Sequence, residues 1–176
     1  MTIRNARADD LPAVIDIYNY EVAHGVATFD TVPWTLDDRA PWFAAHVSSR
    51  HPLIVAEEGG RVVAWGSLSA WSDRCAYARA AEVSLYVHQD HRGRGLGRVL
   101  LAELIARGRA AGLGVLLARV ESSGVASLGL HRGLGFRPIG TMRRVGEKAG
   151  RVLDVVLLDL HLDTPAPLDS GPRRGH

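Results

Sequence analysis

The sequence contains a single cysteine, Cys75, and a single lysine, Lys148. One cysteine excludes an intrachain disulfide and a C-x-x-C metal site, and it is typical of a reducing compartment such as the cytoplasm. The sequence also lacks an apolar run of about 18 residues, so we expect no transmembrane helix and no membrane partner. The first residues are typical of a β-strand and not of a signal peptide. These features predict a cytoplasmic protein that needs no metal.

The sequence also has little excess of either charge, since its formal net charge is only +2. Arginine provides every cationic side chain except Lys148, and the arginines are scattered apart from groups at residues 92–98 and at the C-terminus. The sequence has no basic face interleaved with aromatic residues. This pattern argues against a nucleic-acid-binding protein.

The chain has 176 residues, of which 47% are hydrophobic, and this suits one domain with a substantial core. We expect the domain to span residues 1–163. Residues 164–176 are rich in proline and glycine and are predicted to form a disordered tail.

Hydrophobic periodicity predicts the element order β-α-α-β-β-β-α-β-α-β-β, which is typical of an α/β protein with a mixed sheet flanked by helices. The predicted strands are residues 2–6, 53–57, 61–69, 81–87, 114–120, 137–145 and 151–162. The predicted helices begin after Asp9 or Asp10 and after Thr35, and two more span residues 96–111 and 125–134.

The most informative segment is a basic, glycine-rich turn that follows the strand at residues 81–87 and directly precedes a helix. It consists of Arg92, Gly93, Arg94, Gly95, Leu96, Gly97 and Arg98. Glycine allows a positive φ or a close approach to a ligand. Backbone N–H groups at a helix N-terminus favour anions, and the arginines add positive charge. The turn is therefore predicted to bind a phosphate group.

Several interpretations of this turn compete. A P-loop would need a lysine, which is missing here, and the dinucleotide fingerprint would need one more residue between the last two glycines. The Arg-x-x-Gly-x-Gly turn that binds the pyrophosphate of coenzyme A fits at every position from Arg92 to Gly97. The remaining alternative is a solvent-exposed turn capped by arginines.

Residues 127–136 form a second motif, a predicted helix that leads into Leu134-Gly135-Phe136. With this motif and the glycine-rich turn, the chain resembles the GNAT superfamily of N-acetyltransferases. Within it, the chain is most similar to the phosphinothricin and methionine sulfoximine or sulfone acetyltransferase group. The motifs are Ile17-Tyr18-Asn19, Ala27-Thr28-Phe29, residues 81–87, Leu130-His131, and residues 145–148. The likeness runs from about residue 2 to residue 163.

The resemblance implies the GNAT fold, a mixed central sheet of about seven strands flanked by about four helices, with splayed central parallel strands. Acetyl-CoA would bind along the splayed strand, whose unpaired N–H groups meet the pantetheine arm by β-augmentation. The N–H of Leu85 or Val87 would polarise the acetyl carbonyl. Besides the turn, the implied cofactor-binding residues are Leu85, Tyr86, Val87, Gly124 and Ser127.

The resemblance also implies the catalytic residues. Glu82 occupies the position of the general base that accepts the amine proton, directly or through one water; the alternative is a solvated or salt-bridged strand glutamate. General bases work best when their pKa is close to the working pH. His131 occupies the position of the group that protonates the leaving thiolate or relays its proton. The alternative for His131 is a helix histidine that only hydrogen-bonds pantetheine or the backbone.

In this group the acceptor pocket is lined at the positions of Phe29, Arg74, Cys75, Ala76 and Tyr77. Arg74 would pair with a substrate carboxylate, unless it is simply a surface arginine. We therefore expect direct acetyl transfer to the primary amine of a small amino-acid-like substrate, by a homodimer. Two other functions remain open: a protein N-terminal or lysine acetyltransferase, and a non-catalytic acyl-CoA-binding module.

Overall fold

The computed structural model describes residues 1–163, which form one mixed seven-stranded sheet with four α-helices. This confirms the predicted fold class. The predicted tail, residues 164–176, lies outside the described residues. Within residues 1–163, no helix is long and apolar enough to cross a membrane. The same part of the chain contains no group of three or more His, Cys, Asp or Glu residues arranged to hold a metal ion.

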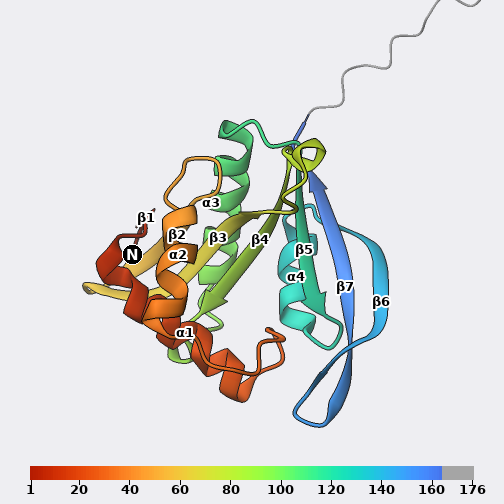
Figure 1. Cartoon of the computed structure of the whole chain (residues 1–176), viewed down its shortest axis with the longest axis horizontal. Coiled ribbons are helices and arrows are strands. Elements are labelled where there is room, and N and C mark those ends of the chain that lie inside the picture. Colours follow the sequence, from red (N-terminus) through yellow and green to blue (C-terminus); the bar gives the residue numbers. More distant parts are fainter. Residues whose placement is uncertain (164–176) are drawn as a thin grey trace, which may run out of the picture.

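The sheet has the strand order β1-β2-β3-β4-β5-β7-β6. Its strands are β1 (Thr2–Asn5), β2 (Leu53–Glu58), β3 (Arg61–Ala70), β4 (Ala80–Val87), β5 (Val115–Glu121), β6 (Arg137–Lys148) and β7 (Arg151–His161). All neighbours are antiparallel except β4 and β5, which are parallel. The β4–β5 contact therefore joins two antiparallel halves of the sheet (Figure 1).

Helices cover both faces of the sheet (Figure 1). They are α1 (Leu11–His24), α2 (Leu36–Ala45), α3 (Leu96–Ala110) and α4 (Val125–Gly133). Three short 3-10 turns connect other elements: η1 (Ala8–Asp10), η2 (Cys75–Tyr77) and η3 (Gln89–His91). The predicted strand and helix order is thus confirmed, with β6 extending three residues beyond its predicted end at Val145.

Alternate residues of each strand point to opposite faces, and this divides the core in two. Trp65 of β3 packs with Val14 and Tyr18 of α1, whereas its neighbour Ala64 belongs to the cluster formed with Leu100 of α3. The α3 side contains most of the buried leucines. The aromatic cluster on the α1 side includes Trp34 and Trp42 as well. Both layers hold β3 and β4 rigidly from either face.

The predicted helix caps have different outcomes. Thr35 caps α2 as predicted, because its hydroxyl accepts a hydrogen bond from the Asp38 N–H at 3.2 Å. Asp10 is the N-cap residue of α1, but its carboxylate does not cap that helix. Instead it accepts hydrogen bonds from the Arg7 N–H at 2.7 Å and from the Arg4 guanidinium at 2.6 and 2.9 Å. The ion pair with Arg4 of β1 outcompetes the local cap.

The burial of His46 leads us to expect that the free energy of unfolding depends on pH. The ring is buried, its Nδ1–H donates to the Trp42 carbonyl at 2.7 Å, and its Nε2 accepts from the Ser69 hydroxyl at 2.8 Å. Burial lowers the pKa of His46, so the unfolded chain binds a proton more readily than the folded one. The stabilisation is therefore present above the unfolded pKa of about 6.5 and is lost as the pH falls below it, by at most about 1.4 kcal/mol per pH unit.

We expect urea unfolding to show a smaller pH-dependent loss of stability in His46→Gln than in the wild type between about pH 7.5 and 5.5. His24→Gln, at an exposed position, is the matched control and should keep the wild-type slope. An unchanged slope in His46→Gln would contradict this assignment.

Candidate active site

The parallel strands β4 and β5 are paired over only three positions, Ala80 with Val115, Ala81 with Leu116, and Glu82 with Leu117. Beyond Glu82 the two strands diverge toward their carboxyl ends (Figure 1). This confirms the predicted splayed central strands. The splay leaves residues 83–87 of β4 without a strand partner on the β5 side.

The register of β4 against its antiparallel neighbour β3 shows which backbone N–H groups of β4 face the gap beside β5. The Leu68 N–H donates to the Pro52 carbonyl at 3.0 Å, so the polar backbone groups of Leu68 face β2. Val83 is its partner in β4, and hydrogen-bonded and non-hydrogen-bonded pairs alternate along an antiparallel ladder. The N–H groups of Val83, Leu85 and Val87 therefore face the opening, where a ligand carbonyl can accept from them.

A cavity of about 880 Å³ occupies the space between the two halves of the sheet. This volume suits a small-molecule ligand. The predicted site residues that line it are Phe29, Glu82, Leu85, Tyr86, Val87, Arg92, Gly93, Gly95, Leu96, Gly97, Gly124, Ser127 and His131. Those outside its lining are Arg74, Cys75, Ala76, Tyr77, Arg94 and Arg98. The cavity brings together the turn, the splayed strand and both candidate catalytic residues.

The glycines of the turn serve two purposes. Gly93 and Gly95 adopt φ angles of +72° and +81°, in the left-handed region that side chains disfavour. A Cβ on Gly97 would lie 3.2 Å from Leu130 and 3.4 Å from Leu85, so this glycine allows close packing of α3. Arg98 N–H donates to the Gly95 carbonyl as the first intrahelical bond. The amides of the residues before Arg98 are free for an anion.

Two of the three arginines of the turn, Arg92 and Arg94, are already paired with carboxylates in the free protein. Arg92 donates to Glu21 of α1 at 2.5 Å, and Arg94 forms an ion pair with Glu58 at 3.2 Å. A guanidinium held by a carboxylate offers fewer donors to a second anion. The backbone amides, more than the side chains of Arg92 and Arg94, are therefore the groups of this turn that we expect to bind an anion.

Glu82 lies at the vertex of the splay, and its side chain is 19% exposed. Arg119 of β5 reaches across from the other half of the sheet. Its Nε donates to Glu82 Oε1 at 2.7 Å and its Nη2 to Glu82 Oε2 at 2.5 Å. Sequence reasoning did not identify Arg119. The available signal was a cation inside an otherwise apolar parallel strand, where a charge needs a partner.

His131 of α4 is buried at the other wall of the cavity. Its Nδ1–H donates to the Ser127 carbonyl at 2.8 Å, and burial lowers the pKa of the ring. A neutral ring with its proton on Nδ1 presents Nε2 as an acceptor. This state favours a proton relay or a hydrogen bond to the ligand over a permanently charged acid.

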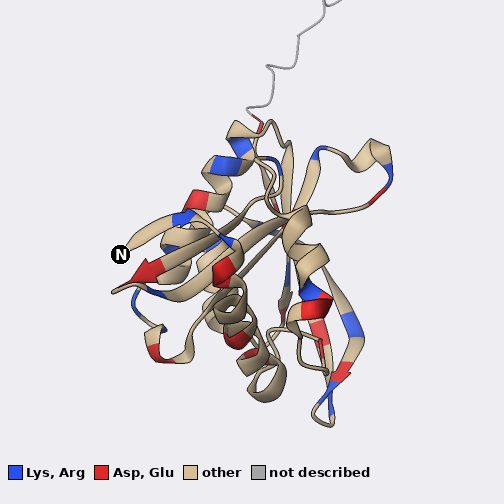
Figure 2. Cartoon of the chain, turned by 60° about the vertical axis from the view of Figure 1, so that its left-hand side comes forward, with Lys and Arg blue, Asp and Glu red and all other residues tan. Residues whose placement is uncertain are grey.

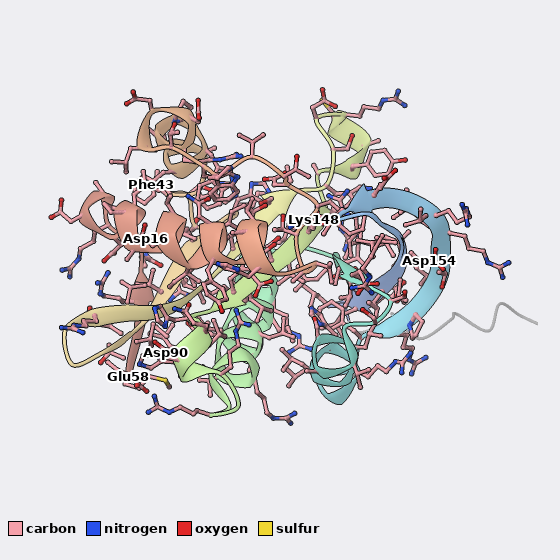
Figure 3. All side chains as sticks on the ribbon, turned by 90° about the horizontal axis from the view of Figure 1, so that it is seen from below. Asp16, Phe43, Glu58, Asp90, Lys148 and Asp154 are labelled. Carbon is pink, nitrogen blue, oxygen red and sulfur yellow. The ribbon has the colours of Figure 1, made fainter. Side chains whose placement is uncertain are left out.

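Phe29, which lines the cavity, contacts a segment that is distant in the sequence. A Cβ on Gly146 would lie 2.2 Å from the Phe29 ring, so only glycine allows this packing. The buried Lys148 donates from Nζ to the carbonyls of Glu21 and Thr28, at 3.1 and 2.8 Å. Figure 3 shows Lys148 between the α1 side and the β6–β7 hairpin. The hairpin thereby holds the loop that follows α1.

The predicted acceptor residues Arg74, Cys75, Ala76 and Tyr77 lie elsewhere. They belong to an exposed turn between β3 and β4 that projects from the sheet (Figure 2). Within one chain they do not border the cavity. Their role in acceptor binding therefore stays a prediction, and the cation that borders the cavity beside Glu82 is Arg119.

Comparisons with known proteins agree with this geometry. The model of the acetyltransferase (GNAT) family matches residues 16–136. An L-methionine sulfoximine/L-methionine sulfone acetyltransferase of Pseudomonas paraeruginosa is 41% identical over 172 residues, covering 97% of this chain and 98% of that protein. The L-amino acid N-acyltransferase MnaT of Escherichia coli is 40% identical over 163 residues, covering 93% and 95%.

Among solved structures, YncA of Salmonella typhimurium with its cofactor acetyl-CoA superposes with a TM-score of 0.89 at 39% identity, covering 94% of this chain and 96% of that one. The matched region spans the splayed strands, the glycine turn and α4. The predicted resemblance is confirmed: the chain belongs to the GNAT acetyltransferase family.

Proposed function

We propose that this protein transfers an acetyl group from acetyl-CoA to the primary amine of a small amino-acid-like acceptor. The acceptor would be of the methionine sulfoximine, methionine sulfone or phosphinothricin type. One observation supports this most strongly: the free amides of Leu85 and Val87 and the carboxylate of Glu82 lie on the same splayed strand and line the same cavity. The relatives named above support this acceptor class, because one is a methionine sulfoximine and methionine sulfone acetyltransferase and the other an L-amino acid N-acyltransferase.

In this proposal acetyl-CoA occupies the cavity along its length. The diphosphate would bind the backbone amides at the N-terminus of α3, which the left-handed Gly93 and Gly95 orient. The pantetheine arm would lie along β4 as an added strand. Its amide carbonyls and its thioester carbonyl would then accept hydrogen bonds from the N–H groups of Leu85 and Val87, near Gly124 and Ser127.

The proposed mechanism assigns each proton to a residue. Glu82 accepts a proton from the acceptor ammonium, directly or through one water, and leaves a neutral amine. The amine nitrogen attacks the carbonyl carbon, and the strand N–H groups stabilise the negative charge that develops on its oxygen. The C–S bond then breaks, and the second proton of the amine passes through Nε2 of His131 to the leaving thiolate.

A panel of amines tests this proposal. The protein is incubated with acetyl-CoA and with phosphinothricin, methionine sulfone, methionine sulfoximine, a polyamine or a peptide, and thiol release is followed. We expect turnover with at least one of the three amino-acid-like amines. Reaction with the peptide alone would favour a protein acetyltransferase, and acetyl-CoA binding without any turnover would favour a binding module.

We also propose that the protein acts as a homodimer in the cytoplasm. The edge strand β6 leaves Ile139 and Val145 about half exposed, which supports contact with a second copy, and the single cysteine supports a reducing compartment. Basic and acidic residues are interspersed on the described chain, which supports a small molecule over nucleic acid as the partner (Figure 2). Light scattering of the purified protein tests the dimer.

A further inference from the structure

The vertex of the splay holds a pair of charges that the proposed mechanism leaves unexplained. Glu82 must take a proton, yet both of its oxygens accept hydrogen bonds from Arg119. A carboxylate that is hydrogen-bonded to a guanidinium through both oxygens is less available to a second partner. A base held in this way needs a step that releases it.

Arg119 is placed to leave Glu82. Its side chain is 53% exposed, it lines the cavity, and its guanidinium carbon lies 5.6 Å from the centre of the Trp71 ring. Two of its five N–H donors are used on Glu82, so three remain for another acceptor. The opposite half of the pair is fixed, because Glu82 sits in the paired part of β4.

The chemistry of an amino acid suits this site. Its carboxylate and its amine are attached to the same carbon, so an amine placed against Glu82 brings the carboxylate within reach of Arg119. The two oxygens of a carboxylate match the planar fork of a guanidinium. The acceptor carboxylate therefore offers Arg119 the same two-oxygen edge that Glu82 offers in the free protein.

We propose that Arg119 binds the carboxylate of the acceptor and that this exchange of partners frees Glu82 as the base. In the free protein Arg119 pairs with Glu82; in the acceptor complex it pairs with the substrate. The freed Glu82 carboxylate then accepts one proton from the substrate ammonium. This inference rests on the proposed function and makes Arg119 both the specificity residue for α-amino acids and the control on the base.

The other charged groups around the cavity have hydrogen-bond partners other than Glu82 and Arg119. Glu21 is held by Arg92, Asp30 by Tyr18 and Trp34, and Glu121 by Ser122 and Ser123. The remaining titratable residues of the lining are Tyr86, His91 and His131. Tyr86 lies on the same strand as Glu82, and burial raises the pKa of its hydroxyl, so it stays neutral at working pH. Arg119 is thus the charged partner of Glu82, and the other charged groups of the cavity have partners of their own.

The test compares an acid and its amide as acceptors. Arg119→Gln is assayed with L-methionine sulfone and with its carboxamide, which keeps the amine but removes the carboxylate. We expect the KM for the acid to rise about tenfold to a hundredfold, the loss typical of a charge-assisted bidentate contact, and the KM for the amide to change far less. Arg119→Lys should recover part of the preference. Arg109→Gln, an exposed arginine of α3, is the matched control and should match the wild type.

The comparison of the two acceptors separates this role from a merely structural one. If Arg119 only supported the fold, Arg119→Gln should change the KM for the acid and the KM for the amide to the same extent. An unchanged ratio of these two KM values would overturn the inference. A loss of acid preference in Arg74→Gln but not in Arg119→Gln would overturn it too.

Binding without turnover keeps this inference distinct from the proposed function. Calorimetry measures the binding of methionine sulfone to the protein saturated with coenzyme A, with and without Arg119→Gln. If no amino-acid-like amine is acetylated but its binding still depends on Arg119, the proposed function fails and the carboxylate site stands. If an amino-acid-like amine is acetylated and its binding does not depend on Arg119, the proposed function stands and the carboxylate site at Arg119 fails.

Discussion

Glu82→Gln is expected to lower kcat about a hundredfold to ten-thousandfold, the usual contribution of general acid–base catalysis. Glutamine has nearly the same shape but accepts no proton at neutral pH. The side chain sits at the vertex of the splay and not in the turn that would hold the diphosphate. The dissociation constant of acetyl-CoA should therefore change little.

Steady-state thiol release measures kcat, and calorimetry measures acetyl-CoA binding to the same preparation. Glu103→Gln is the matched control, because this glutamate lies on α3, pairs with Arg107 and lies outside the lining of the cavity. It should retain wild-type kcat. A parallel loss of kcat and of acetyl-CoA affinity in Glu82→Gln would show that the residue holds the site together and is not the base.

Replacing both left-handed glycines of the turn, Gly93→Ala with Gly95→Ala, is expected to weaken acetyl-CoA binding about thirtyfold to a thousandfold. The left-handed conformation costs a residue with a side chain about 1–2 kcal/mol, so the turn should relax in the free variant, and binding must restore the conformation at both positions for about twice that cost. A Cβ at either position meets no atom within 4 Å, so the added methyl groups cause no clash in the free protein. The loss therefore measures the turn conformation that aligns the amides.

Gly112→Ala is a matched control for this pair. Gly112 follows the other end of α3 with a φ of +71°, and a Cβ there also meets no atom within 4 Å. It should cost a similar amount of stability per site in urea unfolding while leaving the acetyl-CoA dissociation constant unchanged. If the double variant keeps wild-type affinity, the amides of this turn do not bind the diphosphate.

Much of the fold was predictable because its signals are local. The loop Gly59-Gly60 joins β2 and β3 between the predicted strands at residues 53–57 and 61–69, with both residues at positive φ. Gly112 has a positive φ and directly follows the predicted end of the helix at residue 111. In both cases the residue type itself restricts the backbone, so neighbours in sequence suffice.

The candidate site was predictable only in part. Residues 82–87 of β4 and most residues of the turn line the cavity because they follow one another along a strand, a turn and a helix. The acceptor side was not predictable in the same way. Arg74 lies on a projecting turn outside the cavity, and Lys148 binds carbonyls 127 and 120 residues away in the sequence. Contacts between residues so far apart in the sequence leave no local sequence pattern from which they could be predicted.

The amino-acid sequence by itself determined the order of strands and helices and the left-handed conformation of the glycine turn. Both depend on periodicity and on residue types close together in the chain. Only the tertiary structure decided that Arg119 faces Glu82, a contact between residues 37 positions apart on two strands that diverge just beyond it. The register and the splay of those strands are set by packing on both sheet faces, and packing is a property of the whole fold.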